Sequence, residues 1–284
     1  MQRRMIFIKR IMIACALLAA WMPASGLEVD GGKICAYATW GDKACGMDEE
    51  MACPMLSVMK FPQALYVANC LKRSGQALDT EITVRKRKLM KNTWSPMLEG
   101  MGRKQKFTYG ELLRLSLQES DNNACDLLFK AFGGPDRVQD YMASLGMSDI
   151  HIGATERQMM LDPGKSSLNT SSPKEMVALL EWFYSHRNDD AWLTYVWNLM
   201  AGCRTGMARI PSAVGADDVV VHKTGTGFPA AKGISAINDA GIIIHPDGTH
   251  TIMAIFALDF PDAPTAEKAL RQKVMEVEAM RDEE

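Results

Sequence analysis

The sequence predicts an α+β fold, in which an antiparallel five-stranded sheet is flanked by helices and an all-helical sub-domain is inserted between its strands. Three observations support this prediction. Strand-like segments lie near both ends of the chain, helical signals fill the middle, and no repeat or low-complexity segment interrupts them. With 284 residues, of which 47% are hydrophobic, the chain is long enough to bury a sizeable core.

The strands are expected at the two ends of the chain. Residues 34–40 have a strand pattern, and the turn at Gly41 and Asp42 returns a second strand toward Met47. Near the C-terminus, the His-Pro-Asp-Gly sequence at 245–248 supplies hairpin-turn chemistry. The remaining segments that alternate or run apolar are 219–223, 233–244 and 249–258.

The helices are expected in the middle and at the C-terminus. Thr108 and Glu111 have the spacing of a capping box, and so do Ser172 and Glu175. Further helices are predicted at 135–145 and 264–280. Residues 27–48 and 203–284 would then form an α/β sub-domain, and residues 49–202 would form the all-helical one.

The first 26 residues have the pattern of a secretory signal peptide. Four basic residues precede an apolar stretch at 11–22, and small residues follow up to Gly26. The apolar stretch is too short to span a bilayer, which takes about 20 residues, so we expect export to the periplasm and no stable membrane anchor. Six cysteines would follow the cleavage site, either as disulfides whose pairing the sequence does not select or as small buried hydrophobic residues.

The charge of the chain argues against a nucleic-acid partner. The formal net charge is −2, so no overall field would gather a polyanion. One dense basic run occupies residues 85–88, with Lys91 close behind, and we interpret it as a solvated face.

The first candidate for chemistry is Ser57 with Lys60. If the segment that follows Pro54 is helical, this spacing puts the amine and the hydroxyl on one face, at a helix N-terminus that favours an oxyanion. The spacing alone is weak, because it occurs by chance about once in a chain of this size.

Two further short motifs follow along the chain. Ser120, Asp121 and Asn122 would either cap a helix or carry a proton relay and a substrate-binding amide. Lys223, Thr224 and Gly225 come after a β-branched run, where they would either form a glycine-rich strand exit with an exposed lysine or hold a carboxylate.

Together these three motifs, in this order and at this spacing, resemble those of the class A serine β-lactamases and the related penicillin-binding proteins. The resemblance covers essentially the whole chain after the signal peptide. It implies the β-lactamase/transpeptidase-like fold and assigns catalytic roles to Ser57, Lys60 and Ser120, with substrate binding by Asn122 and by the residues from Lys223 to Gly225.

Further positions match the same family. Glu156 stands where the family has the glutamate that activates the deacylating water, which the transpeptidases lack. Arg209 matches an arginine that supports binding of the substrate carboxylate, and Trp94 matches an aromatic at the rim of the cleft. The backbone amides of Ser57 and Thr226 would form the oxyanion hole. The five histidines have no metal-site spacing, so we expect neither metal nor cofactor.

The sequence departs from the commonest family pattern near Glu156. Ala154 and Met160 stand where many members have an arginine and an asparagine that hold the loop, and the local pattern resembles the extended-spectrum branch that includes PER, VEB and CfxA enzymes. Leu56 and Gly227 replace a cysteine pair of some carbapenemases. Cleavage after Gly26 would also leave no counterpart of the family's N-terminal helix, which would expose apolar surface unless the segment at 11–22 is retained or the chain start is misassigned.

The expected function is hydrolysis of penicillins and cephalosporins by a monomer, through a Ser57 acyl-enzyme released by water that Glu156 activates. One alternative is a D-Ala-D-Ala carboxypeptidase, which would release D-alanine without β-lactam turnover. Another is a non-catalytic penicillin-binding sensor domain, which would be labelled stoichiometrically without hydrolysis. The sequence does not rank individual drugs or inhibitors.

Overall fold

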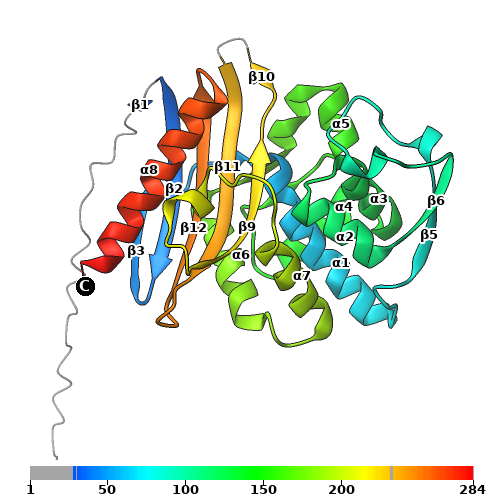
Figure 1. Cartoon of the computed structure of the whole chain (residues 1–284), viewed down its shortest axis with the longest axis horizontal. Helices are drawn as coiled ribbons and strands as arrows, with labels where there is room; N and C mark the ends of the chain where they lie inside the picture. Colours follow the sequence, from blue (N-terminus) through cyan, green and yellow to red (C-terminus); the bar gives the residue numbers. More distant parts are fainter. Residues whose placement is uncertain (1–27, 30, 231–232, 284) are drawn as a thin grey trace, which may run out of the picture.

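The computed structural model describes residues 28–29, 31–230 and 233–283. The expected signal peptide and the question of an N-terminal helix therefore lie outside the described residues. Within them, two regions lie side by side, a sheet with helices on both faces and a mainly helical region (Figure 1).

The sheet has five long antiparallel strands, as the sequence predicts. Their order is β3-β2-β12-β11-β9, and two strands of two residues each extend the sheet. The N-terminal pair lies beside the C-terminal hairpin, because β2 pairs with β12. The strands are β1 (Glu28–Val29), β2 (Gly32–Trp40), β3 (Lys43–Met47), β9 (Val219–Thr226), β10 (Pro229–Ala230), β11 (Gly233–Ile244) and β12 (His250–Phe260).

Helices cover both faces of this sheet. α8 (Ala263–Asp282) packs on one face and α6 (Pro173–His186) on the other, and each contacts β12 (Figure 1). Alternate side chains of β12 therefore enter different cores. Met253 and Ile255 pack in the cluster that includes Leu270 and Val274 of α8, while Phe256 belongs to the larger core shared with the helical region. Burial on both faces explains why this strand is apolar nearly throughout.

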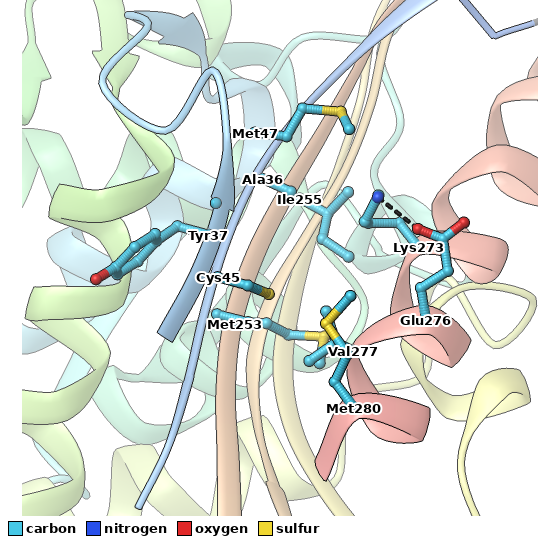
Figure 2. Close-up of a pocket in the computed structure, with 12 residues that line it drawn as sticks. Ala36, Tyr37, Cys45, Met47, Met253, Ile255, Lys273, Glu276, Val277 and Met280 are labelled. Carbon is cyan, nitrogen blue, oxygen red and sulfur yellow. Dashed lines mark hydrogen bonds and ion pairs between the residues drawn. The ribbon is translucent and has the colours of Figure 1, made fainter. Parts of the chain in front are cut away.

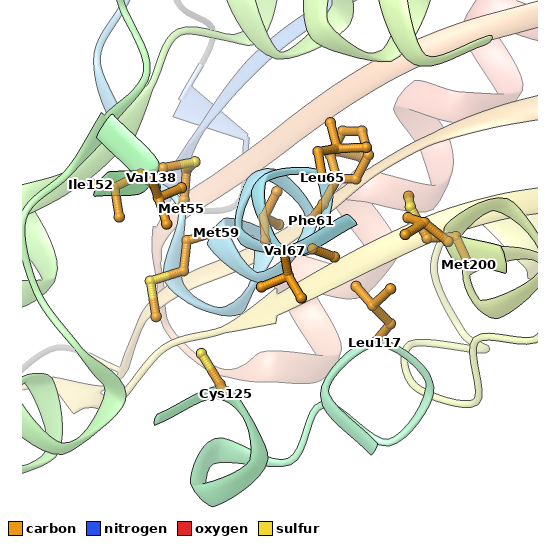
Figure 3. Close-up of a cluster of buried hydrophobic side chains, with 14 of the residues drawn as sticks. Met55, Met59, Phe61, Leu65, Val67, Leu117, Cys125, Val138, Ile152 and Met200 are labelled. Carbon is orange, nitrogen blue, oxygen red and sulfur yellow. The ribbon is translucent and has the colours of Figure 1, made fainter. Parts of the chain in front are cut away.

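The helical region is built around α1, whose buried face lies at its centre (Figure 3). Phe61, Leu65 and Val67 of α1 are fully buried there. The surrounding side chains in the figure include Leu117, Cys125, Val138, Ile152 and Met200. The helices of this region are α1 (Lys60–Ser74), α2 (Tyr109–Gln118), α3 (Asn122–Phe132), α4 (Pro135–Ser144), α5 (Glu156–Leu161) and α7 (Ala191–Ala201).

Short strands also lie in the segment for which the sequence predicts only helices. They form two small sheets, β4 with β8 and β7, and β5 with β6. Their bounds are β4 (Cys53–Pro54), β5 (Glu81–Arg85), β6 (Lys104–Thr108), β7 (His151–Ile152) and β8 (Asn169–Ser171). The 3-10 turns are η1 (Leu56–Met59), η2 (Lys86–Lys88), η3 (Pro96–Leu98), η4 (Pro163–Leu168) and η5 (Ile210–Ala213).

The two predicted capping boxes have different outcomes. At the start of α2, the Thr108 hydroxyl accepts from the amide of Glu111 and the Glu111 carboxylate accepts from the amide of Thr108, so the box is complete. At the start of α6, Ser172 accepts from the amide of Glu175, but the Glu175 carboxylate accepts from the amide of Asp149. A tertiary contact therefore replaces the reciprocal half of the second box.

An apolar hollow lies between α8 and the β2–β3 edge of the sheet (Figure 2). Ala38, Cys45, Met253 and Val277 are among its lining residues, and an ion pair between Lys273 and Glu276 lies beside it. The six cysteines of the described residues are free thiols, and Cys35, Cys53, Cys125 and Cys203 are buried.

Candidate active site

The segment that presents Ser57 is held in a strained conformation. Leu56 directly before it has φ of 51°, in the left-handed region that a leucine rarely adopts, and its side chain is buried. Ser57 itself is partly exposed in η1, and its Oγ lies 3.2 Å from Oε1 of Glu156. The buried leucine thus fixes the direction in which the serine hydroxyl points.

Lys60 is fully buried at the start of α1 and is surrounded by oxygen atoms. Its Nζ lies 2.7 Å from the carbonyl oxygen of Ser120, 2.7 Å from Oδ1 of Asn122 and 2.9 Å from Oε1 of Glu156. Because an ammonium group without water needs such partners, this shell holds the lysine in place. Ser57 and Lys60, which the sequence pairs by spacing, meet on the same carboxylate oxygen.

Asp121 performs the capping that was the alternative interpretation of its motif. Its carboxylate accepts from the amide of Ala124 as the N-cap of α3, and also from Ser95 and from the amide of Met97. Burial raises the pKa of Asp121. The two outer residues of the motif, Ser120 and Asn122, are therefore free to face the cleft.

Ser120 connects the two buried lysines. Its φ is 55°, and its Oγ lies 3.3 Å from Nζ of Lys60 and 2.9 Å from Nζ of Lys223. Lys223 is fully buried, so the strand exit does not expose it as the alternative interpretation would require. Burial, together with the charge of Lys60, lowers the pKa of Lys223 to about 7.

β9 ends beside Ser57 with Thr224, Gly225 and Thr226. A Cβ on Gly225 would lie 2.5 Å from the carbonyl oxygen of Met55, so only glycine lets this strand approach the segment before Ser57. The hydroxyl of Thr224 lies 2.6 Å from the hydroxyl of Thr205.

Arg209 supports this strand from behind. Its guanidinium donates to the carbonyl oxygens of Gly225 and Asn238 and to Oγ1 of Thr226, and it pairs with Glu267 at 3.1 Å. It is 4% exposed, so it acts on the cleft through the strand that it braces.

A buried group of Cys203, His222 and Asp239 lies under the same strand. His222 Nδ1 is 2.9 Å from Oδ1 of Asp239, and the Cys203 thiol lies 3.4 Å from Oγ1 of Thr205. Burial alone would lower the pKa of His222, but the charge and hydrogen bond of Asp239 raise it to about 10. Burial opposes ionisation of Cys203, yet its hydrogen bond to His222 lowers the thiol pKa to about 7.

Glu156 is the first residue of α5, and its loop is anchored by residues that the sequence did not identify. The Asp126 carboxylate accepts from the backbone amides of Glu156 and Arg157, both at 2.9 Å. Burial, with the charge of Glu156, raises the pKa of Asp126 to about 7. The Asn169 side chain accepts from the amide of Ala154 and donates to its carbonyl oxygen. These two hydrogen bonds to the backbone hold the position at which many family members have an arginine.

These residues enclose a cleft of about 380 Å³. Trp94 stands at its rim with 62% of its surface exposed, and its indole donates to the carbonyl oxygen of Glu119. Ser57, Ser120, Asn122, Glu156, Thr224, Thr226 and Trp94 line the cleft together with Leu56, Met159, Met160, Thr205, Gly227 and Phe228. Lys60, Lys223 and Arg209 lie behind this lining, and all the candidate residues are thus brought to one place.

Sequence reasoning missed Asp126, Asn169 and Thr205. Asp126 and Asn169 lie 30 and 15 residues from the positions that they hold, and no local motif marks them. The sequence contains one indirect signal for these residues. Ala154 and Met160 replace the side chains that usually hold the loop, so other residues had to anchor it.

Comparisons with known proteins agree with this geometry. A model of the beta-lactamase enzyme family matches residues 30–274. The extended-spectrum beta-lactamase PER-1 of Pseudomonas aeruginosa is 32% identical over 223 residues, which are 78% of this chain and 72% of that protein. Beta-lactamase VEB-1 of the same organism is 32% identical over 72% of this chain and 70% of its own length.

Solved structures show the same architecture. A class A beta-lactamase from Bacteroides cellulosilyticus matches with a TM-score of 0.81 and 29% identity, covering 87% of this chain and 90% of that one. The TLA-3 extended-spectrum beta-lactamase matches with a TM-score of 0.81 and 28% identity, covering 87% and 93%.

Proposed function

The chain belongs to the class A serine β-lactamases, which open the β-lactam ring by hydrolysis, and we propose that it does so with Ser57 as nucleophile and Glu156 as the base for deacylation. The substrates that we propose are penicillins and cephalosporins. The remaining roles follow from the positions of the side chains in the cleft.

Acylation begins when the Ser57 hydroxyl attacks the carbonyl carbon of the ring. Its proton passes to the Glu156–Lys60 pair, because Oε1 of Glu156 lies within hydrogen-bond distance of both Ser57 and Lys60. The carbon–nitrogen bond of the ring then breaks, and the nitrogen takes a proton through Ser120. This relay is supported by the position of the Ser120 hydroxyl between the ammonium groups of Lys60 and Lys223.

The substrate carboxylate is bound by Lys223 with the hydroxyls of Thr224 and Thr226, and Arg209 orients Thr226. The Asn122 side chain binds an amide of the substrate, and Trp94 covers it at the rim. The developing oxyanion is stabilised by the backbone amides of Ser57 and Thr226.

Deacylation requires water on the Glu156 side of the ester. The contact of Glu156 with Ser57 at 3.2 Å carries this assignment, because it puts a base beside the acylated oxygen. A sensor domain keeps its acyl group and has no need of such a base, so the contact argues against that alternative. A carboxypeptidase also hydrolyses its acyl-enzyme, and it is the similarity of this chain to the PER-1 and VEB-1 beta-lactamases that argues against it.

The test compares Ser57→Ala, Glu156→Gln and Glu99→Gln, the last being an exposed glutamate outside the cleft. With a chromogenic cephalosporin, Ser57→Ala should show no turnover and Glu99→Gln should match the parent enzyme. Glu156→Gln should release one equivalent in a burst and then retain the acyl group, which intact-protein mass spectrometry detects. Steady turnover by Glu156→Gln would remove this residue from its assigned role.

The cellular site and assembly are also part of the proposal. Among the described residues, no helix has the length and apolar character needed to cross a bilayer. We expect residues 1–26 to be removed on export to the periplasm, and the enzyme to act as a monomer whose sub-domains are 27–48 with 203–284, and 49–202. Mass spectrometry of the exported protein's N-terminus and size-exclusion chromatography test these expectations.

A further inference from the structure

Positive charge is concentrated in one short part of the chain. Residues 85–106 contain eight lysines and arginines but only one acidic residue, Glu99, so this segment carries a net charge of +7. The whole chain carries −2, which leaves −9 for the remainder. The net charge of the chain is near zero, but the positive and negative charges are distributed unevenly along it.

The fold gathers this charge on one surface, which we call the basic face. It is formed by the end of β5, by η2 and by the start of β6, at the end of the helical region distant from the main sheet (Figure 1). A groove of about 590 Å³ crosses it. The groove is lined by Arg85, Lys86, Arg87, Met101, Gly102, Arg103 and Lys104.

Among the described residues, no acidic side chain forms an ion pair with a charge that lines the groove. Arg85 and Lys104 are directly opposite each other in the β5–β6 ladder, an arrangement that is unfavourable for like charges. Lys86 of η2 is partly buried, and its ammonium group donates to the backbone carbonyl oxygens of Leu98 and Met101. Within the parts of the chain that the structure describes, the paired strands β5 and β6 form one ion pair, between Lys106 and Glu81.

The chemistry of the basic face favours an extended anionic surface over a small bound anion. Arg85, Arg87 and Arg103 are all exposed, and the groove contains no buried charged side chain that would define a site for one phosphate. Clusters of four to eight lysines and arginines bind anionic lipid headgroups through their summed attraction. We infer that the basic face docks the enzyme reversibly on a membrane surface rich in anionic phospholipids.

The net negative charge of the rest of the protein favours one orientation of the enzyme on the membrane surface. An anionic surface attracts the basic face and repels the other sides, so that the enzyme would bind in one orientation. The attraction acts within a Debye length, about 8 Å at physiological ionic strength, so docking is weakened by salt.

The experiment measures co-sedimentation of the full-length exported protein with vesicles. One set contains phosphatidylcholine alone, and the other also contains phosphatidylglycerol. We expect binding to the anionic vesicles at low salt only. The double variant Arg85→Gln with Arg87→Gln should partition roughly 25-fold more weakly, because each charge contributes about five-fold.

The matched control removes two exposed charges elsewhere, with Lys268→Gln and Arg271→Gln on α8, and should partition like the parent protein. The parent protein and both double variants should hydrolyse a chromogenic cephalosporin at the same rate, which separates this inference from the catalytic proposal. Three results would overturn it: no binding of the parent protein to anionic vesicles, equal losses in both double variants, or release from the vesicles by millimolar inorganic phosphate at constant ionic strength.

Discussion

Asp126 offers the sharpest test of how the loop that carries Glu156 is held. Its carboxylate is partly buried and accepts from two consecutive backbone amides, those of Glu156 and Arg157. Replacing Asp126 with alanine leaves both amides without their acceptor. Each hydrogen bond to a charged acceptor contributes about 1.5–3 kcal/mol, so even one lost bond corresponds to a 10- to 100-fold effect if the whole loss falls on the position of Glu156.

The loss should fall on deacylation alone. Lys60, the other member of the pair that takes the Ser57 proton, keeps its contacts with Ser120 and Asn122. Asp126→Ala should therefore acylate at nearly the parent rate and then release its product about 10- to 100-fold more slowly. A stopped-flow burst with a chromogenic cephalosporin measures the first step, and mass spectrometry of the quenched enzyme measures the accumulated acyl-enzyme. Parent-like turnover, or an equal loss of acylation, would refute the reasoning.

The pH dependence sharpens the same prediction. Burial raises the pKa of Asp126 to about 7, so below that pH the side chain is protonated and one of its oxygens becomes a hydroxyl donor that faces the amide it had accepted from. The deacylation rate should therefore fall as the pH drops below about 7. In Asp126→Asn, which cannot titrate, this decrease at low pH should vanish, and the overall rate should be reduced.

The same pKa affects stability. Because the folded-state pKa of Asp126 is above the unfolded value of 3.8, the ionised carboxylate costs stability, and the free energy of unfolding declines as the pH rises from about 4 to 7.

Three further predictions concern substrate binding and the strand behind it. The pKa of Lys223 is lowered to about 7 by burial, so its charge is lost above that pH and KM should rise with pH; in Lys223→Arg, assayed over the same range, KM should stay constant. Gly225→Ala forces a Cβ to within 2.5 Å of the Met55 carbonyl oxygen, and overpacking of about 1–3 kcal/mol should lower Tm by roughly 2–12 °C in calorimetry, together with kcat/KM. Arg209→Lys retains the charge but cannot reach all its acceptors, so KM should rise about ten-fold with little change in kcat; an unchanged KM would exclude a role in binding.

The sequence was sufficient wherever structure depends on local pattern. The five long strands, the helix starts at Thr108 and Ser172, and the helix ending before Gly146 were predicted from turn, cap and periodicity signals, and the structure has them. The two small sheets were not predicted, because their strands are two to five residues long and are defined by pairing between distant segments.

The sequence could name the candidate catalytic residues because they match family motifs, but it could not name the residues that hold them in place. Asp126 lies in the interior of α3 and has no local pattern that distinguishes it from a surface aspartate. His222 and Asp239 belong to neighbouring strands, and only the β9–β11 register brings them together. Such contacts depend on the tertiary fold, so a single sequence contains no short-range signal for them.

The loop that carries Glu156 is held in place although it lacks the arginine and the asparagine that hold it in many family members. Ala154 contributes no side-chain anchor, but its backbone amide and carbonyl oxygen are both bound by Asn169. Asp126 then binds the next two free amides, at the N-terminus of α5, where a carboxylate is favoured by the helix dipole. The position of Glu156 therefore depends on backbone groups, which every sequence supplies, and on two side chains outside its own segment. This division leaves the side chains of the loop itself, such as Met159 and Met160, available to shape the cleft that they line.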